Sequence, residues 1–331
     1  MMYRLLVTLL LLQAVCARAD WHNYSFEVMG TRASVELWLP GSTRQAKTLF
    51  DQVEQEMRRI ETLLSSYRDD SIVAQINQLD AQQSMVLDRE VFELLASAQR
   101  YAQLSEGGFD ITVSSAGRLY DYREKKQPAG QALVEQLPKV DYRKLLLDAE
   151  RLTVAFASAG MQIDLGGIAK GYAVDRSIAL LQGAGIQSAL VSAGGDSRML
   201  GDRGPAMGTD AGRLPWMIGI QHPRERSQQA LRLPLASVAI STSGDYERYF
   251  IHDGERVHHI INPQTGRPAS GLVSASVIGP HSQDCDALST TVFVLGAERG
   301  LALIETLDDY EAVVIDAAGV VSFSSGLVSD P

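Results

Sequence analysis

Hydrophobic and polar residues follow two different spacings in the first third of the chain. Residues 24–39 alternate between the two kinds, which predicts two strands joined by a turn at Met29-Gly30-Thr31. In residues 46–64 the apolar side chains recur every three or four positions, the spacing of a helix that buries one face. Residues 91–104 repeat that spacing and end before a glycine pair, a common helix ending. A short strand or turn is expected at residues 109–113.

The middle of the chain alternates between polar and apolar stretches. Residues 125–139 are polar and contain two prolines, so we interpret them as an excursion between two lobes. Residues 152–156 and 161–165 have the pattern of a hairpin, which leads into a glycine turn and a helix. A Gly-rich loop is expected over residues 197–213.

The second half of the chain is dominated by short segments with a strand pattern. We expect strands at residues 189–192, 216–221, 237–241, 248–252, 257–261, 275–278, 311–315 and 320–323. A helix that opens at Asp286 and ends at Gly296, and another over residues 301–307, lie among the last of these strands. This mixture predicts an α+β fold with largely antiparallel sheets and packed helices, rather than a doubly wound parallel sheet.

The first residues have the composition of an export signal. Arg4 precedes an apolar run over residues 5–12, and small residues at positions 17 and 19 form a cleavage site. The apolar run is too short for a stable membrane span. The sequence therefore predicts a signal peptide at residues 1–19 and one catalytic unit of two lobes at residues 20–331.

Cysteine and charge content limit how the protein is anchored, whether it forms a disulfide and which partners it binds. Cys16 leaves open a lipoprotein anchored in the inner membrane, but Val15 is bulkier than such processing prefers, so soluble export ranks first. Cleavage would leave Cys285 without a cysteine partner, which excludes an internal disulfide. The formal net charge is −10, and −12 without residues 1–19. This charge argues against nucleic acid or an anionic membrane as the main partner.

The glycine turn within residues 163–175 is the first candidate for chemistry. Gly166 and Gly167 leave no side chain above the main chain, so a ligand can approach it directly. The helix that follows offers unpaired N–H groups and a positive dipole end to a phosphate. Asp164 and Lys170 flank the turn with opposite charges. The pattern predicts a phosphate-bearing ligand together with a metal, and a purely structural turn is the alternative.

Asp286 and Thr290 form the second candidate. Their spacing puts them one turn apart on one face of the predicted helix, and a carboxylate with a hydroxyl suits Mg²⁺. The alternative is that Asp286 is a first-turn acid and Thr290 a threonine bonded to its own helix. His258 and His259 are neighbours in a predicted strand and point to opposite faces, so at most one serves a given pocket.

Taken in order, the motifs resemble one family over nearly the whole mature chain, the ApbE-type flavin transferases, or FAD:protein FMN transferases. The segments that carry the resemblance are Met29-Gly30-Thr31, Ser66-Tyr67, Gly108-Phe109-Asp110, residues 164–171, Ala193-Gly194-Gly195-Asp196, Ser243-Gly244-Asp245-Tyr246, residues 259–266 and residues 286–296. Asn262 stands where the family usually has Asp, Ser192 where it often has Asn, and Ile111 where Pro is common. We do not interpret these departures as loss of activity.

The resemblance implies an exported α+β protein that binds FAD with Mg²⁺. It implies transfer of the FMN moiety to a threonine or serine hydroxyl of a target protein, with release of AMP. The implied metal ligands are the Gly167 carbonyl, Asp286 and Thr290. The implied FAD contacts are Met29, Tyr67, Gly108, Phe109, Asp110, Asp164, Lys170 and Ile260.

Attack of a hydroxyl on the FMN phosphorus calls for a base. His259 is our candidate, with Asp286 or a metal-bound water as competitors. The family suggests a periplasmic location and, as acceptor, a flavoprotein subunit of a respiratory or electron-transfer complex. Two alternatives stay open: hydrolysis of FAD to FMN and AMP, and flavin binding without catalysis.

Overall fold

The computed structural model describes residues 19–40, 43–203 and 214–328. Cys16 and the predicted signal peptide, except for its last residue, lie outside these residues. So does the second part of the predicted Gly-rich loop.

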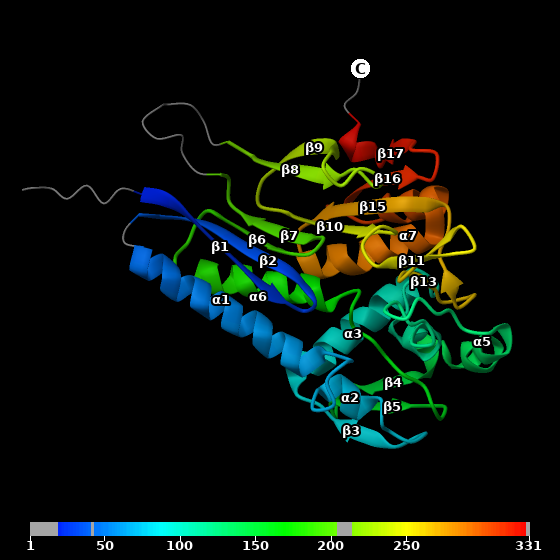
Figure 1. Ribbon diagram of the computed structural model, residues 1–331. Coiled ribbons are helices and arrows are strands. Elements are labelled where there is room, and N and C mark those ends of the chain that lie inside the picture. The colour runs from blue at the N-terminus through cyan, green and yellow to red at the C-terminus, as the bar shows by residue number, and fades with distance from the viewer. Residues whose placement is uncertain (1–18, 41–42, 204–213, 329–331) are drawn as a thin grey trace, which may run out of the picture.

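One antiparallel sheet of eight strands forms the centre of the molecule, in the order β1-β2-β6-β7-β10-β15-β16-β17 (Figure 1). Its strands are β1 (Ala19–Val28), β2 (Thr31–Pro40), β6 (Ala189–Ala193), β7 (Asp196–Leu200), β10 (Ala239–Gly244), β15 (Leu272–Gly279), β16 (Glu311–Asp316) and β17 (Val321–Phe323). β1 and β2 meet at the predicted turn, where Met29 and Gly30 have φ angles of 53° and 69°. Positive φ at both positions is what a two-residue hairpin turn requires.

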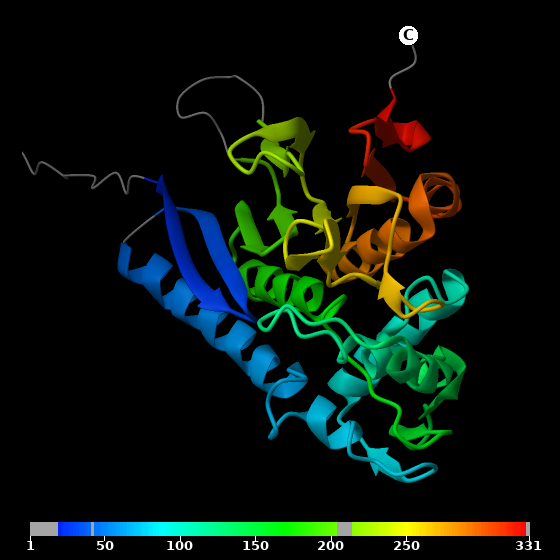
Figure 2. The same ribbon diagram turned by 45° about the vertical axis from the view of Figure 1, so that its right-hand side comes forward.

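Three long helices cover one face of this sheet (Figures 1 and 2). They are α1 (Thr43–Leu64), α6 (Ala169–Gly183) and α7 (Ser282–Ile304). The hairpin of β8 (Trp216–Gln221) and β9 (Gln229–Leu235) packs on the other face. Alternation along the strands separates the two sides, because Val277 belongs to the core under the helices whereas its neighbour Ile278 packs with Trp216. The sheet therefore has an apolar core on each side.

All three tryptophans of the chain meet at one end of the sheet. The ring centroid of Trp21 lies 5.5 Å from that of Trp38 and 5.2 Å from that of Trp216. The Arg203 guanidinium lies 5.8 Å from the ring centroids of both Trp21 and Trp216. We call these four residues the tryptophan cluster.

A second lobe follows α1 and appears at the lower right of Figure 1. Its helices are α2 (Ile72–Ile76), α3 (Arg89–Leu104), α4 (Ser114–Gly117) and α5 (Gly130–Gln136), with short 3-10 turns η1 (Ile111–Val113), η2 (Leu137–Lys139) and η3 (Tyr142–Lys144). Its sheet has the order β3-β5-β4, formed by Ser84–Val86, Thr153–Phe156 and Leu145–Asp148. Phe156 of this sheet belongs to the same apolar cluster as Val35 of the main sheet, so the lobes share one core.

Short elements complete the chain. They are the hairpins β11–β12 (Tyr249–His252, Glu255–His258) and β13–β14 (Ile261–Asn262, Arg267–Pro268), and the 3-10 turn η4 (Ser325–Leu327). The prediction of an α+β fold with largely antiparallel sheets is confirmed.

The predicted hairpin of residues 152–156 with residues 161–165 is wrong. β5 pairs with β4 and β3, and residues 161–165 form no strand. The reason lies in a side chain: Asn77 accepts the N–H of Ile163 at 2.7 Å and donates to its carbonyl at 2.9 Å. A distant amide therefore satisfies the backbone groups that a neighbouring strand would otherwise pair.

Several boundaries also differ from the predictions. Residues 109–113, expected as a short strand or turn, contain the 3-10 turn η1, so the second alternative is confirmed. The predicted Gly-rich loop begins with strand β7. β9 was not predicted, although Leu231, Leu233 and Leu235 alternate with the exposed Arg232 and Pro234; a proline within a run argues against a strand. The last long helix begins at Ser282 and not at Asp286.

The predicted break at Gly296 is confirmed, since its φ of 81° interrupts α7. Among the described residues, α7 alone is long and apolar enough to cross a membrane by length and composition. It packs closely on β10, β15 and α6, and 11 of its side chains, from Ser282 to Ile304, are buried. This is the setting of a core helix.

Candidate active site

The glycine turn ahead of α6 is shaped by Asp164. Its carboxylate accepts the N–H of Gly166 at 2.7 Å and the hydroxyl of Ser66. The residue before α6, Ile168, provides no side-chain cap. The N–H groups in the first turn of α6 therefore need a hydrogen-bond acceptor other than a capping side chain of Ile168.

That acceptor comes from α7. The carboxylate of Asp286 accepts the N–H of Gly171 at 3.1 Å, so it caps the start of α6. The relation is reciprocal, because Asp175 of α6 accepts the N–H groups of Ser282 and Gln283 at the start of α7, both at 2.9 Å. We call this arrangement the reciprocal cap.

Close contact between the two helices depends on one glycine. A Cβ atom at Gly171 would overlap the carbonyl oxygen of Ser282, so any other residue would push the helix ends apart. Gly171 therefore brings α7 near enough for Asp286 to reach α6.

Lys170 points its ammonium group at two carboxylates from other elements. Its Nζ lies 2.7 Å from Oδ2 of Asp196 and 3.2 Å from each carboxylate oxygen of Asp286. A third contact, of 3.3 Å, joins it to the carbonyl oxygen of Gly166. The side chains of Asp196 and Asp286 are only 3% and 5% exposed. We call Lys170, Asp196 and Asp286 the charged triad.

Burial and charge perturb the triad. Burial, followed by the charge of Asp196, raises the pKa of Asp286 well above its ordinary value, although Lys170 acts in the opposite direction. Burial also opposes the charge of Lys170, but both carboxylates outweigh it and the pKa of Lys170 is raised. Two carboxylates and one ammonium carry a net charge of −1 when all three are ionised, so the triad attracts a further cation.

Thr290 and Gly167 lie beside the triad. Thr290 is one turn after Asp286 on α7, and a Cβ atom at Gly167 would be 3.6 Å from its hydroxyl oxygen. That Cβ would also lie 3.2 Å from the ring of Phe109, so the turn packs on the face of a buried aromatic. Ser243, at the end of β10, lies 3.1 Å from the Thr290 hydroxyl.

The donors gathered here fit a hard divalent cation. A carboxylate, a hydroxyl and exposed main chain are the oxygen ligands that Mg²⁺ accepts, and the net charge of the triad favours a cation. No group of three or more His, Cys, Asp or Glu among the described residues could hold a metal ion, so a hydroxyl and main-chain oxygens would have to complete this site. Coordination by Asp286, Thr290 and the Gly167 carbonyl stays a prediction.

Tyr67, Arg248 and His259 form a second group. Tyr67 is 82% exposed, and its hydroxyl oxygen accepts from the Arg248 guanidinium at 3.3 Å. The main-chain carbonyl of Arg248 accepts the N–H of His259 at 3.1 Å and lies 3.3 Å from its Nδ1. Tyr67 therefore presents a free aromatic face beside the candidate base.

His259 is accessible to solvent and yet crowded by protein. That crowding, with the charge of Arg248, lowers its pKa to about 4, and the charge of Lys170 contributes in the same direction. His259 is thus neutral at pH 7, but the lowered pKa also makes it a weaker base than an unperturbed histidine. If Nδ1–H donates to the Arg248 carbonyl, Nε2 carries the free lone pair.

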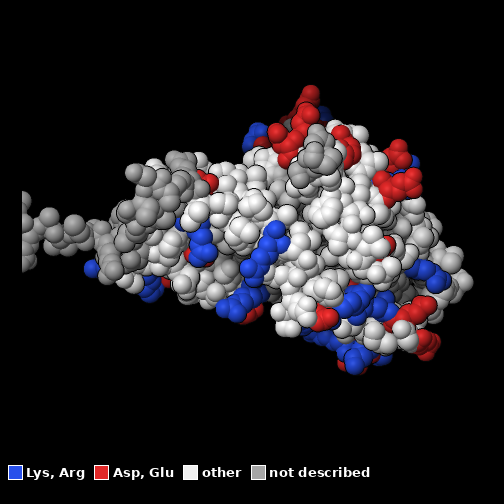
Figure 3. All heavy atoms as spheres, turned by 90° about the horizontal axis from the view of Figure 1, so that it is seen from above, with Lys and Arg blue, Asp and Glu red and all other residues white. Residues whose placement is uncertain are grey.

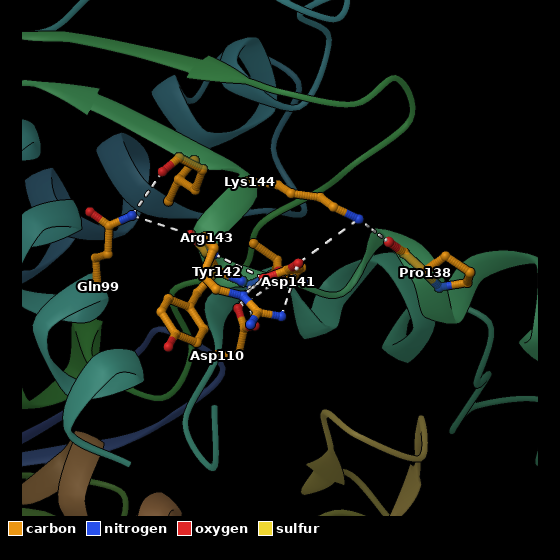
Figure 4. A network of polar contacts seen from close by, with 9 residues as sticks. Gln99, Asp110, Pro138, Asp141, Tyr142, Arg143 and Lys144 are labelled. Atoms are coloured by element: carbon orange, nitrogen blue, oxygen red, sulfur yellow. Dashed lines mark hydrogen bonds and ion pairs between the residues drawn. The ribbon is translucent and has the colours of Figure 1, made fainter. Parts of the chain in front are cut away.

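Asp110, another predicted FAD contact, has its carboxylate engaged by protein hydrogen bonds. It is buried, and its oxygens accept the N–H and hydroxyl of Thr112 and the N–H of Tyr142, at 2.7 to 2.8 Å. Figure 4 shows it facing the loop of Asp141 and Arg143, away from open space. Asp110 therefore caps η1 and ties it to the second lobe.

Three other predicted FAD contacts also have structural roles. The N–H of Met29 donates to Glu61 at 2.7 Å, and Ile260 is buried in the core. Gly108 packs against Leu295, since a Cβ atom added at Gly108 would lie only 2.9 Å from the Leu295 side chain. Their contacts with a flavin stay predictions.

Sequence reasoning missed Asp196, Asp175 and Arg248 as site residues. Asp196 was visible as the end of the motif Ala193-Gly194-Gly195-Asp196, but nothing in its spacing shows that it faces Lys170. Arg248 carried no signal, because no local pattern reveals its contacts with Tyr67 through the guanidinium or with His259 through the main chain.

Comparisons with known proteins agree on one family. The sequence profile described as "ApbE family" matches residues 29–314. The FAD:protein FMN transferase of Treponema pallidum is 36% identical over 322 residues, which cover 94% of this chain and 89% of the relative.

Two solved structures share the fold. The ApbE protein of Thermotoga maritima superposes with a TM-score of 0.82 at 30% identity, over 93% of this chain and 98% of the other. The flavinyl transferase ApbE of Pseudomonas stutzeri, in its apo form, gives 0.79 at 30% identity, over 93% and 95%. With the profile match and the identity to curated relatives, these results assign the chain to the ApbE family.

Proposed function

We propose that this protein transfers the FMN moiety of FAD to a threonine or serine hydroxyl of an acceptor protein and releases AMP. The observation that carries the proposal is the charged triad beside Thr290 and the glycine turn, in a member of the ApbE family. Relatives at 29% to 36% identity bear the name FAD:protein FMN transferase. A buried site with a spare negative charge and oxygen ligands suits a metal-bound pyrophosphate.

In this reaction the acceptor oxygen bonds to the FMN phosphorus. The bond from that phosphorus to the bridging oxygen breaks, and AMP leaves with the electron pair. The hydroxyl proton passes to a base, for which neutral His259 is our candidate. Such a transfer depends mainly on positioning and on charge stabilisation.

We assign the cation site to Asp286, Thr290 and the Gly167 carbonyl. Mg²⁺ bound there would neutralise charge that develops on the phosphate oxygens. The Lys170 ammonium, paired with Asp196, would supply a second positive charge beside the cation site, and Tyr67 offers a ring face for stacking.

We also propose that the protein works outside the cytoplasm, as the export signal at residues 1–19 predicts. Residues 20–331 would then act as one unit, and lipidation at Cys16 is the alternative to a soluble form. The acceptor we propose is a flavoprotein subunit of a respiratory or electron-transfer complex.

An assay with a candidate acceptor tests the proposal. The purified protein is incubated with FAD, Mg²⁺ and an acceptor subunit, and flavin fluorescence of the denatured acceptor and AMP release are both measured. We expect equal amounts of bound FMN and AMP, and loss of both with Asp286→Asn. A threonine-to-alanine acceptor is the matched control.

Two outcomes would replace the proposal. AMP and free FMN formed without an acceptor, at the same rate, would indicate hydrolysis of FAD. Tight FAD binding that survives Asp286→Ala, with no AMP, would indicate a flavin-binding protein without catalysis.

A further inference from the structure

We propose that Asp196 is a positioning residue that holds the Lys170 ammonium and thereby sets how tightly the site binds its divalent cation. The inference rests on the proposed function, because the cation belongs to that function. Asp196 itself is not a proposed ligand of either FAD or the metal.

The main chain fixes Asp196 firmly in place. It is the first residue of β7 and lies opposite Ser241 of β10. The preceding Gly195 allows this approach, because a Cβ atom there would come within 2.5 Å of the Thr242 carbonyl oxygen. The Asp196 carboxylate therefore has little freedom to follow a moving partner.

The ammonium of Lys170 lies closer to Asp196 than to Asp286. The distances are 2.7 Å to one oxygen of Asp196 and 3.2 Å to both oxygens of Asp286. Oδ2 of Asp196 is buried and depends on this ammonium for its counter-charge. The Lys170 side chain is 26% exposed and is the one member of the triad that has room to move.

Asp286 therefore has two competing uses. In the arrangement described it neutralises Lys170, and in the proposed reaction it binds a cation. A cation at Asp286 and an ammonium 3.2 Å from the same oxygens repel one another strongly in a buried site. Lys170 must therefore move away from Asp286 when a cation binds there. It can do so and still stay paired with the carboxylate of Asp196.

Loss of the Asp196 charge should then weaken cation binding through Lys170. With Asp196→Asn, Asp286 is the only carboxylate left to neutralise Lys170, and the ammonium competes more strongly with the cation. With Lys170→Gln this competition is gone, and the charge of Asp196 should matter little. A simple long-range attraction between Asp196 and the cation predicts the same weakening in both backgrounds.

A double-mutant cycle separates the two explanations. The full-length protein, without FAD, is titrated with Mn²⁺ as the probe, and free Mn²⁺ is counted by electron paramagnetic resonance. The variants are Asp196→Asn, Lys170→Gln and the double variant. We expect Asp196→Asn to weaken binding about tenfold and Lys170→Gln to tighten it, with less than about a twofold effect of Asp196→Asn in the Lys170→Gln background.

The inference would be overturned if Asp196→Asn weakened Mn²⁺ binding equally in the wild-type and Lys170→Gln backgrounds. It would also be overturned if Asp196→Asn did not weaken binding in the wild-type background. Lys170→Met also removes the ammonium and replaces Lys170→Gln in the cycle if that variant does not fold. Asp196→Glu keeps the charge and should restore most of the affinity. If Asp196→Glu bound Mn²⁺ as weakly as Asp196→Asn does, this would also overturn the inference. Asp141→Asn, at an ion pair with Arg143 in the second lobe, is the matched control and should bind as the wild type does.

The same titration distinguishes the two proposals. If the wild type binds Mn²⁺ and Asp286→Ala does not, the proposed metal site stands, and a wild-type affinity of Asp196→Asn defeats only the positioning role. If Mn²⁺ binding survives Asp286→Ala, the proposed metal site fails as well.

Discussion

His258 and His259 are neighbours in the chain with opposite surroundings. His258 is buried, its Nε2 lies 2.9 Å from the Ala269 carbonyl, and its Nδ1 accepts the N–H of Ile260 at 3.3 Å. Both ring nitrogens are therefore used by the main chain in the neutral form. His258 is the last residue of β12 and His259 follows it in a bend, so the predicted strand over both residues ends between them and their rings have different surroundings.

The burial of neutral His258 predicts a loss of stability in mild acid. Burial lowers the pKa of His258 in the native state. Below about pH 6.5, His258 therefore binds a proton in the unfolded chain but stays neutral in the native chain. His258 has no effect on the pH dependence above that pH. Below it, the free energy of unfolding should fall by up to ~1.4 kcal/mol per pH unit until the native pKa is reached.

Urea unfolding at pH 7.5, 6.5 and 5.5 checks this. His258→Gln can keep a hydrogen bond to Ala269 but cannot take up a proton, so it should show a smaller loss between pH 6.5 and 5.5 than the wild type. Identical losses in the two proteins would show that His258 is not responsible.

The residues of the site differ in how far the sequence reveals them. Lys170, Asp286 and Thr290 stand in local patterns, a glycine turn before a helix and a carboxylate one turn from a hydroxyl, and the structure brings them together. Asp196 meets Lys170 only through the register of β7 with β10, which no local pattern encodes. Asp110 looked like a ligand contact because its use as a cap leaves no separate signature in the sequence.

At the scale of elements, the site depends on how closely α6 and α7 approach. Gly171 and Gly183 lie in the same helix, but only the first faces another element, since nothing lies within 4 Å of a Cβ atom added at Gly183. The two glycines therefore form a matched pair for measuring the contact.

We expect Gly171→Ala to destabilise the protein by about 1–3 kcal/mol, as overpacking in a core does. It should also weaken Mn²⁺ binding, because the added methyl group pushes α7, with Asp286 and Thr290, away from the glycine turn and its Gly167 carbonyl. Gly183→Ala should be neutral, or stabilise by up to about 1 kcal/mol through helix propensity. Thermal unfolding and Mn²⁺ titration of both variants give the measurement, and equal effects of the two substitutions would contradict the proposed role of Gly171.

Elements with strong periodicity were predicted well, and those set by tertiary contacts were not. The pattern of residues 46–64 belongs to α1, whose buried side chains recur on one face. Residues 161–165 have a strand-like sequence, but Asn77 takes the hydrogen bonds that decide between strand and loop. The helix start at Ser282 was missed because its cap, Asp175, comes from another helix.

For the whole molecule, the main sheet joins two apolar cores. The same strands supply Val277 to the helix side and Ile278 to the hairpin side, so loss of one core removes support from the other. Charge is distributed in small groups: on the face in Figure 3, acidic and basic side chains often lie next to one another, and uncharged surface separates these groups.

The shared sheet predicts unfolding in a single transition. Tryptophan fluorescence reports on the tryptophan cluster alone, and far-ultraviolet circular dichroism reports on all helices and strands. We expect the two signals to give the same urea midpoint for the wild type. A fluorescence midpoint clearly below that of circular dichroism would show that the β8–β9 side opens first and that the cores are independent.

The reciprocal cap has a consequence for the order in which the chain can be completed during synthesis. Gly171 precedes its acceptor Asp286 by 115 positions, and Asp175 precedes Ser282 by 107. A nascent chain therefore exposes the start of α6, with Lys170, long before the partner helix is made. Prematurely terminated products that stop before residue 282 keep the glycine turn but lack Asp286 and Thr290. The proposed site is thus assembled late, and we expect truncated chains to be inactive rather than partly active.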